Sequence, residues 1–178
     1  MRVLRPLPFP TDLCTLQAMT LDQPTWIAKP LDAFTTEEWE SLCDGCGKCC
    51  TFTLENEDTG ERFATRVACR LFDSAACGCA DYANRFDRVP TCIRITPAAI
   101  GTLDFLPDTC AYRLVATGKP LPEWHHLVCG DPMAVHRLGW SVRGRTISET
   151  IVDETGTDYE DYIVVWRRGR RLGRPAAR

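Results

Sequence analysis

The sequence predicts an α+β fold, a small single domain with much irregular structure that carries a β-hairpin and short helices. Three observations lead to this prediction. The alternating segments 51–55 and 61–67 flank the turn signal Asp58-Thr59-Gly60, which is typical of a hairpin. Helix start signals precede only short stretches of helical pattern. Cysteines interrupt the regular segments, and 178 residues suffice for one domain with an ordinary core.

Composition divides the chain into three parts. Residues 1–22 contain scattered prolines and no clear period, so we expect an irregular N-terminal arm. Residues 23–166 form the predicted domain. Residues 167–178 hold six arginines and no acidic residue, which predicts a disordered basic tail.

The first half of the domain begins with a short helix. Thr35 and Glu38 have the spacing of a capping box, which predicts a helix over 36–42 that ends where the cysteines begin. The hairpin follows this helix. Residues 68–96 mix cysteine with polar residues, and there we expect short helices and loops around the cysteines.

Helix signals continue into the second half. Pro97 can open a helix that runs through about residue 103. Asp108 or Thr109 is expected to cap another helix over 111–116. A further helical turn or two is predicted at 132–138.

The last part of the domain is richer in Val, Ile and Thr. We predict strands at 141–143 and 146–152 for this reason. Residues 162–166 are expected to form an apolar closing segment.

The charge and the apolar pattern of the sequence argue against nucleic-acid binding, secretion and membrane insertion. Residues 1–166 hold 15 basic and 24 acidic side chains, and this acidic body disfavours nucleic acid as a partner. Pro6, Pro8 and Pro10 interrupt any apolar core of a secretory signal. No run approaches the roughly 20 apolar residues of a membrane span. We therefore expect no membrane association and a cytoplasmic protein whose thiols stay reduced.

The densest chemical feature is the segment Cys43-Asp44-Gly45-Cys46-Gly47-Lys48-Cys49-Cys50, which places four thiols within eight residues. Thiols at this density either form disulfides or hold a soft metal. Eleven cysteines, an odd number, fit a closed disulfide framework poorly, and a reducing compartment disfavours it further. We interpret the segment as a metal site, in which Gly45 and Gly47 allow tight turns.

The spacing leaves the identity of the metal open. A C-x2-C step is the usual half of a tetrahedral zinc site, whereas two steps that share Cys46 supply three corners of a [4Fe–4S] cubane. The C-x3-C-P continuation of bacterial ferredoxins is absent, and Cys50 directly follows Cys49. Neighbouring side chains generally diverge, so these two residues should serve different centres, or one should lie outside the coordination sphere.

Five further cysteines complete the set of candidate ligands. Nine thiols exceed the four that one tetrahedral ion or one cubane needs, so they suit two centres or one polynuclear site. The candidate metal ligands are Cys43, Cys46, Cys49, Cys50, Cys69, Cys77, Cys79, Cys92 and Cys110. Cys14 and Cys129 lie outside this cluster and are interpreted as small buried apolar residues.

No other motif assigns an activity. The common nucleotide-binding and hydrolytic signatures and the radical-SAM spacing are absent. The sequence therefore identifies no catalytic residue and favours a protein that is not an enzyme. His125 could act as a base or as a non-cysteine ligand, but a structural role is favoured for a lone histidine beside a tryptophan, and still more for His126.

The segment from Glu38 to Cys50 closely resembles the opening motif of the YcgN-like proteins, which belong to the YkgJ-type (CxxCxxCC) cysteine-cluster family of bacteria. The resemblance covers roughly residues 25–152, with all nine candidate cysteines in register. It continues through Val67-Ala68-Cys69-Arg70, Cys77-Gly78-Cys79, Cys92-Ile93, Leu106-Pro107-Asp108-Thr109-Cys110 and Glu123-Trp124-His125. It implies a bacterial cytosolic protein that chelates zinc or iron, in a family whose biochemical role is not established. The nine cysteines are carried over as ligands, with His125 and His136 as weaker candidates.

The leading functional prediction is thus a zinc- or iron-chelating protein, whose cluster is structural or an iron–sulfur centre. One alternative is a redox enzyme or electron carrier that uses a [4Fe–4S] cluster. A second is an interaction module for a protein partner, in which zinc only builds the surface. A third is metal trafficking, which would need labile metal that passes to an acceptor.

Overall fold

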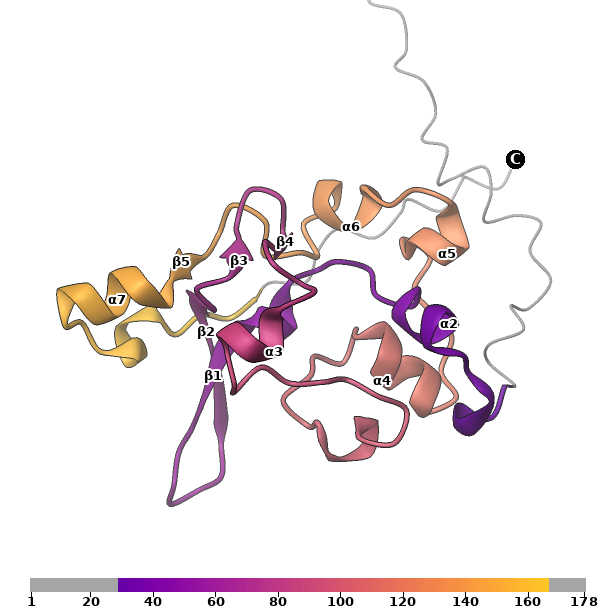
Figure 1. Cartoon of the computed structure of the whole chain (residues 1–178), viewed down its shortest axis with the longest axis horizontal. Coiled ribbons are helices and arrows are strands. Elements are labelled where there is room, and N and C mark those ends of the chain that lie inside the picture. The colour runs from indigo at the N-terminus through magenta and orange to yellow at the C-terminus, as the bar shows by residue number, and fades with distance from the viewer. Residues whose placement is uncertain (1–28, 167–178) are drawn as a thin grey trace, which may run out of the picture.

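A computed structural model of the chain describes residues 29–166, and it confirms the α+β class (Figure 1). The predicted arm at 1–22 and the predicted tail at 167–178 lie outside these residues. The described elements are η2 (Leu31–Ala33), α2 (Thr36–Glu40), η3 (Lys48–Cys50), β1 (Thr51–Glu55), β2 (Arg62–Ala68), β3 (Phe72–Asp73), β4 (Gly78–Cys79), α3 (Arg85–Arg88), η4 (Ile100–Thr102), α4 (Ala111–Ala116), α5 (His126–Cys129), α6 (Ala134–Arg137), β5 (Ile147–Ser148), α7 (Glu149–Thr155) and η5 (Tyr159–Tyr162).

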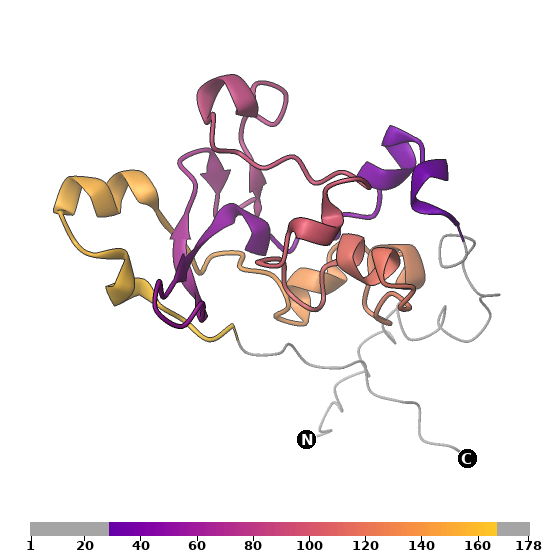
Figure 2. The ribbon, with the colours of Figure 1, turned by 90° about the horizontal axis from the view of Figure 1, so that it is seen from below.

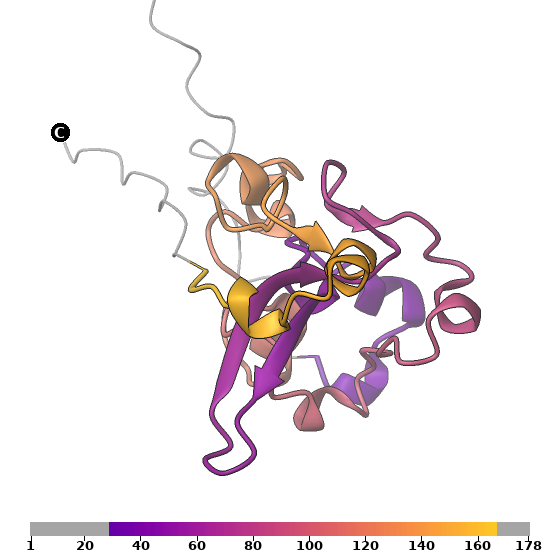
Figure 3. The ribbon, with the colours of Figure 1, turned by 90° about the vertical axis from the view of Figure 1, so that its left-hand side faces the viewer.

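The predicted hairpin is present. Strands β1 and β2 pair antiparallel, and Figure 3 shows the hairpin projecting beyond the rest of the fold. Its turn is built as the sequence suggests, because Gly60 has a φ of 68° and the Asn56 side chain accepts hydrogen bonds from the amides of Asp58 and Thr59, both at 3.0 Å. Strand β5 adds to β2 in parallel and completes a three-stranded sheet.

Helix α2 begins with the predicted capping box. The Glu38 amide donates to the Thr35 hydroxyl at 3.2 Å, and the Glu38 carboxylate accepts from the Thr35 amide at 2.8 Å. The helix ends at Glu40, earlier than the predicted residue 42, and delivers the chain directly to Cys43. Its buried face carries Trp39, whose indole donates to the Ile95 carbonyl at 2.9 Å.

The strand predicted at 146–152 is wrong beyond its first residues. Strand β5 ends at Ser148, whose hydroxyl accepts from the Thr150 amide at 3.3 Å and caps α7 instead. Gly156 ends this helix with a φ of 65°. The capping signals therefore prevailed over the β propensity of Ile151 and Val152. In the helix Val152 is fully buried.

Three other expectations also need correction. No strand forms at 141–143, where the buried Val142 bonds the cysteine segment instead. Only a single 3-10 turn, η4, replaces the helix expected at 97–103. Cys110 is the N-cap of α4, in place of Asp108 or Thr109.

Two apolar clusters lie on the helical side of the molecule. Trp39, Leu106 and Tyr112 belong to the first, and the stacked pair Trp124 and Trp140, with ring centroids 5.1 Å apart, belongs to the second. Figure 2 shows α2 and α4 on this side, with α7 at the opposite end of the molecule. Among the described residues no helix has the length and apolar character that crossing a bilayer requires.

A buried carboxylate ties α7 to the end of β2. Glu149 is 7% exposed, and its Oε1 accepts from the Arg70 amide at 2.7 Å and from Arg70 Nε at 3.0 Å. These bonds hold the chain next to Cys69. A charge-assisted hydrogen bond of this kind contributes about 1.5–3 kcal/mol.

We expect Glu149→Gln to lower the free energy of unfolding by about 1–3 kcal/mol, since the amide keeps the shape but not the charge. Urea unfolding measures this. Glu154→Gln, an exposed change on the same helix, is the control and should stay within about 0.5 kcal/mol of the wild type. Equal effects of the two changes would contradict a specific role for Glu149.

Candidate metal centre

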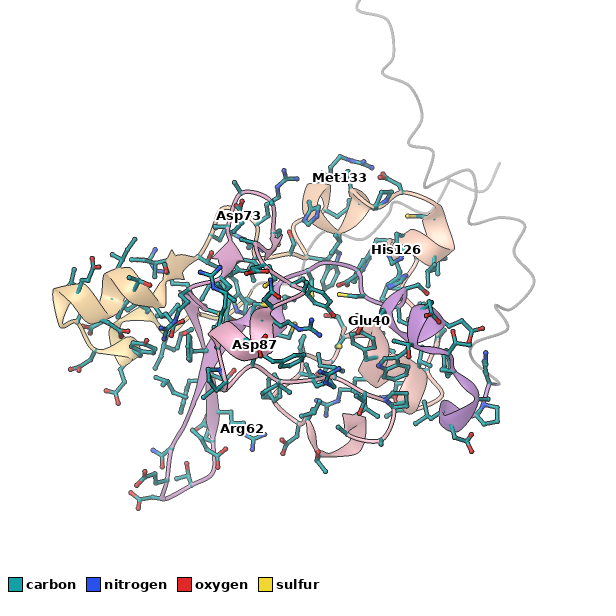
Figure 4. All side chains as sticks on the ribbon, in the orientation of Figure 1. Glu40, Arg62, Asp73, Asp87, His126 and Met133 are labelled. Carbon is teal, nitrogen blue, oxygen red and sulfur yellow. The ribbon has the colours of Figure 1, made fainter. Side chains whose placement is uncertain are left out.

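The nine candidate cysteines are all free thiols, and they line two adjoining cavities. The larger cavity has a volume of about 610 Å³ and the smaller one about 30 Å³. In Figure 4 sulfur atoms gather in the middle of the molecule, between the hairpin and α2. The cysteines that line the larger cavity are Cys43, Cys49, Cys50, Cys69, Cys77, Cys79 and Cys92. Those that line the smaller cavity are Cys43, Cys46, Cys49 and Cys110.

The fold gathers these thiols from segments far apart in the sequence. Residues 43–50 run from α2 to β1 and supply the first four. Cys69 follows β2, Cys77 and Cys79 belong to the β3–β4 hairpin, Cys92 follows α3 and Cys110 precedes α4. The hairpin of β3 and β4 was not anticipated, since two-residue strands leave no periodic signal.

Tight turns shape the segment 43–50. The Asp44 side chain accepts from the Cys46 amide at 2.9 Å through Oδ1. Gly45 and Gly47 have φ values of 69° and 75°, in the left-handed region that favours glycine. The Cys50 amide then donates to the Gly47 carbonyl at 3.1 Å, which closes the 3-10 turn η3. The predicted use of these two glycines is thereby confirmed.

Gly47 also permits a close approach of three segments. A β-carbon at this position would lie 2.7 Å from Phe72, 2.9 Å from the Cys77 sulfur and 2.9 Å from Val142. The same carbon at Gly45 would meet nothing within 4 Å. Gly47 is therefore required by packing as well as by its backbone angle.

The Cys46 carbonyl connects the segment 43–50 to the β3–β4 hairpin. It accepts from the Val142 amide at 2.8 Å, and the Cys77 sulfur lies 3.6 Å from it. Cys77 itself has a φ of 62°, the only positive φ among the described non-glycine residues. Asp73 supports that turn, because its Oδ1 accepts from the amides of Ala75 and Ala76 at 2.8 and 2.9 Å.

Cys49 and Cys50 occupy different positions relative to the cavities. Cys50 lines only the larger cavity, and its carbonyl accepts from the Cys69 amide at 3.0 Å. Cys49 lines both cavities, whereas Cys46 and Cys110 line only the smaller one. The arrangement is compatible with the prediction that adjacent cysteines serve different centres, which stays a prediction.

Burial keeps most of these thiols protonated. It raises the pKa of Cys43 to about 11, although that residue as a whole is exposed, because the surrounding protein excludes water from the sulfur. Burial raises the pKa of Cys46, Cys69, Cys77, Cys92 and Cys110 in the same way. A hydrogen bond from Cys49 lowers the pKa of Cys50, and the charge of Arg85 lowers it further. Since the thiolate binds metal, metal uptake must release protons.

The donor set suits a soft or borderline metal. Nine free thiols are present, and Asp44 Oδ2 is buried without a hydrogen-bond partner within residues 29–166. As the side chains lie, no group of three or more His, Cys, Asp or Glu residues in that range is placed to hold a metal ion. Protonated thiols have no ion to coordinate and so no reason to point at one centre. Metal binding would require them to lose their protons and rotate toward the ion.

The larger cavity has features that sequence reasoning missed. Arg62 and Glu40, both labelled in Figure 4, are among its lining residues. Arg85 also lines it, with its guanidinium 3.6 Å from the Tyr82 ring centroid. Burial and a 2.6 Å hydrogen bond to Glu40 raise the pKa of Tyr82 to about 12. The cavity volume falls in the range of small-molecule sites, about 300–1,000 Å³.

The histidines have structural partners. His125 is fully buried, its Nδ1 accepts from the Leu127 amide at 3.2 Å, and its Nε2 lies 3.0 Å from the Leu42 carbonyl. Nδ1 as an acceptor places the proton on Nε2, so the ring is neutral. His136 contacts the Ser141 hydroxyl at 2.9 Å. His125 and His136 line neither cavity. Cys129 lies buried in the Trp124 cluster, outside both, but it is disulfide-bonded, so the interpretation of it as a plain apolar residue is wrong.

Comparison with known proteins points to one family. Residues 42–111 match the CxxCxxCC model, described as "Putative zinc- or iron-chelating domain", and this range includes all nine candidate cysteines. A UPF0260 protein of Rhizorhabdus wittichii is 56% identical over 146 residues, which cover 82% of this chain and 97% of the relative. UPF0260 proteins of Granulibacter bethesdensis and Azotobacter vinelandii are each 54% identical, over 83% and 80% of this chain and 87% and 94% of theirs. No solved structure matches the chain.

The two glycines of the cysteine segment allow a matched test of packing. Gly45→Ala should cost about 1–2 kcal/mol, the strain of a β-carbon in the left-handed region. Gly47→Ala should cost at least about 1–3 kcal/mol more, because its methyl group would overlap three neighbours. Urea denaturation of the two variants measures the difference. Equal losses would show that the contacts around Gly47 are not the constraint.

His125 should make stability depend on pH. Burial lowers its pKa from 6.5 to about 4, so the folded state binds fewer protons than the unfolded state between these values. Stability is then retained above pH 6.5 and lost as the pH falls toward 4, by about 3 kcal/mol. In His125→Gln this part of the pH dependence should disappear from chemical denaturation curves. An unchanged slope in the variant would argue against a buried neutral His125.

Proposed function

This chain belongs to the UPF0260 family of bacterial proteins, and we propose that it is a cytoplasmic zinc- or iron-chelating protein whose nine cysteines hold the metal. One observation carries the proposal: all nine thiols of the chelating-domain match are free and line two adjoining cavities. Metal uptake requires reduced thiols, and all nine candidate cysteines are free.

The proposed ligands fall into two groups by the cavity they line. Cys46 and Cys110 line the smaller cavity alone, while Cys50, Cys69 and Cys92 are among those that line the larger one alone. Cys43 and Cys49 line both cavities, so either group could include them. Two centres therefore account for more thiols than one tetrahedral ion or one cubane could use.

Residues around the cysteines position both groups of thiols and adjust their charge. Glycine turns bring the sulfurs of residues 43–50 to both cavities, and backbone hydrogen bonds from Cys69 and Val142 hold that segment in place. Arg85 places positive charge beside Cys50, which offsets part of the negative charge of a thiolate site. A bound metal ion would supply Lewis acidity or redox chemistry, depending on its identity.

A second candidate function is a redox role with a [4Fe–4S] cluster in the larger cavity. Its volume of about 610 Å³ and its seven cysteines leave space for a cluster together with a small molecule. Arg85 and Tyr82 line the same cavity and would face such a molecule. A zinc-structured module for a protein partner needs no such space, and nothing in the acidic body favours nucleic acid.

Anaerobic purification followed by elemental analysis and an absorption spectrum tests both candidates. Stoichiometric zinc in a colourless protein would support structural chelation. Iron with sulfide and absorption near about 400 nm would support the cluster. A folded wild-type protein that takes up neither metal after reconstitution would contradict metal chelation altogether.

Serine variants test the division into two groups. Cys46→Ser should lose the metal of the smaller cavity, and Cys50→Ser that of the larger one, because a hydroxyl is a poor replacement for a thiolate. Metal content per chain should fall in each variant, with circular dichroism as the check on folding. Full metal content in folded Cys46→Ser would contradict the assignment of that cysteine.

A further inference from the structure

We propose that Asp44 is a metal ligand which, with Cys43, Cys46 and Cys110, forms a separate site for one divalent cation, zinc or ferrous iron, in the smaller cavity. This inference rests on the proposed function, because it names the ligands of one of the two centres. It adds an oxygen donor to the set of cysteine sulfurs.

The two oxygens of Asp44 have different surroundings. Oδ1 accepts a hydrogen bond from the Cys46 amide at 2.9 Å, which shapes the turn. Oδ2 is buried and has no hydrogen-bond partner within residues 29–166. A buried carboxylate oxygen without a partner is costly, since it has lost its water and gained nothing in exchange. A cation bound at Oδ2 would remove this cost.

Within residues 29–166 no positively charged side chain is placed to take that position. Besides Asp44 and its four cysteines, the smaller cavity has apolar walls that include Ile95, Pro107 and Ala111. Its lining, in the part of the chain that the structure describes, includes no lysine, arginine or histidine. The oxygen and the sulfurs are therefore the only charged or soft donors at this cavity, and all of them are ligands for a metal cation.

The size of the cavity limits what can bind. A volume of about 30 Å³ accommodates one ion, because a single water needs about 10–15 Å³ of such space. A cubane of four irons and four sulfides would not fit. Zinc takes four ligands in tetrahedral sites and accepts both cysteine sulfur and aspartate oxygen, so a mixed set of three sulfurs and one oxygen suits it.

The choice of the three sulfurs follows from the surroundings. Of the two cavities, Cys46 and Cys110 line only the smaller one. Cys43 and Cys49 line both, but Cys49 directly precedes Cys50, which lines only the larger of the two cavities, whereas Cys43 directly precedes Asp44. This leaves Cys43 as the third sulfur, at the cavity that Cys46 and Cys110 also line.

Asp73 provides a matched control within the same chain. Its Oδ1 also accepts from backbone amides, those of Ala75 and Ala76, and so performs the same turn function as Asp44 Oδ1. Asp73 is exposed, sits at the β3–β4 turn (Figure 4), and lines neither cavity. An aspartate that only shapes a turn should behave as Asp73 does.

The test compares Asp44→Asn with Asp73→Asn in the full-length chain. Asparagine keeps the carbonyl oxygen that accepts the amide hydrogen bonds, but it replaces the second oxygen by a nitrogen that cannot bind a metal. Metal-free protein is loaded with zinc alone under argon, and zinc per chain is counted after competition with a chelator. We expect Asp44→Asn to retain one zinc ion fewer than the wild type, with affinity at that site reduced at least about 10-fold. Asp73→Asn should match the wild type.

Equal zinc content and affinity in the two folded variants would overturn the assignment of Asp44 while leaving chelation by cysteines intact. X-ray absorption of zinc-loaded wild type keeps the test decisive if Asp44→Asn does not fold. Oxygen at about 2.0–2.2 Å in addition to sulfur at about 2.3 Å is expected, and a shell of sulfur alone would overturn the proposal. A wild-type protein that binds no zinc and no iron would instead refute the proposed function itself.

Discussion

The structure depends most on how the backbone of residues 43–50 is held between distant segments. This stretch has little regular structure of its own, yet it connects α2 to β1 and supplies four of the nine thiols. Its carbonyls accept from Val142, nearly a hundred residues later, and from Cys69. These bonds satisfy groups that would otherwise be buried and unpaired, so the loop is ordered by its neighbours rather than by helix or strand propensity. Gly47 permits this arrangement, since only glycine leaves space for the Phe72, Cys77 and Val142 side chains that meet there.

The fold could be predicted where the determinants are local. The capping box of Thr35 and Glu38 and the hairpin turn at Gly60 are set by residues three or four positions apart, and both were predicted correctly. The strand predicted at 146–152 failed because two local signals conflicted, and the cap at Ser148 prevailed over β propensity. Elements of two residues, such as β3 and β4, are held by tertiary hydrogen bonds and have no pattern in the sequence.

For the candidate site, the sequence could identify the thiols but not their grouping. Cysteine spacing marks Cys43, Cys46 and Cys49 as one turn, whereas the partner of that turn, Cys110, arrives from a helix start sixty residues later. Arg85 and Tyr82 belong to no recognisable sequence motif. Only the structure shows that they line the same cavity as the cysteines. The buried oxygen of Asp44 is likewise invisible in a sequence, where an aspartate in a turn is ordinarily solvated.

Electrostatics couples the arginines and the thiols of the larger cavity. The larger cavity is lined by two arginines, of which Arg62 pairs with Glu55 and Asp104 at 2.7 and 2.6 Å. No described carboxylate pairs with Arg85, so its charge acts on the nearby sulfur and lowers the pKa of Cys50, together with the hydrogen bond from Cys49. The same hydrogen bond raises the pKa of Cys49. Loss of a proton from Cys49 on metal binding would therefore remove a donor that stabilises the Cys50 thiolate. Metal binding through Cys49 would thus change the proton affinity of Cys50, its neighbour at the larger cavity, which both residues line.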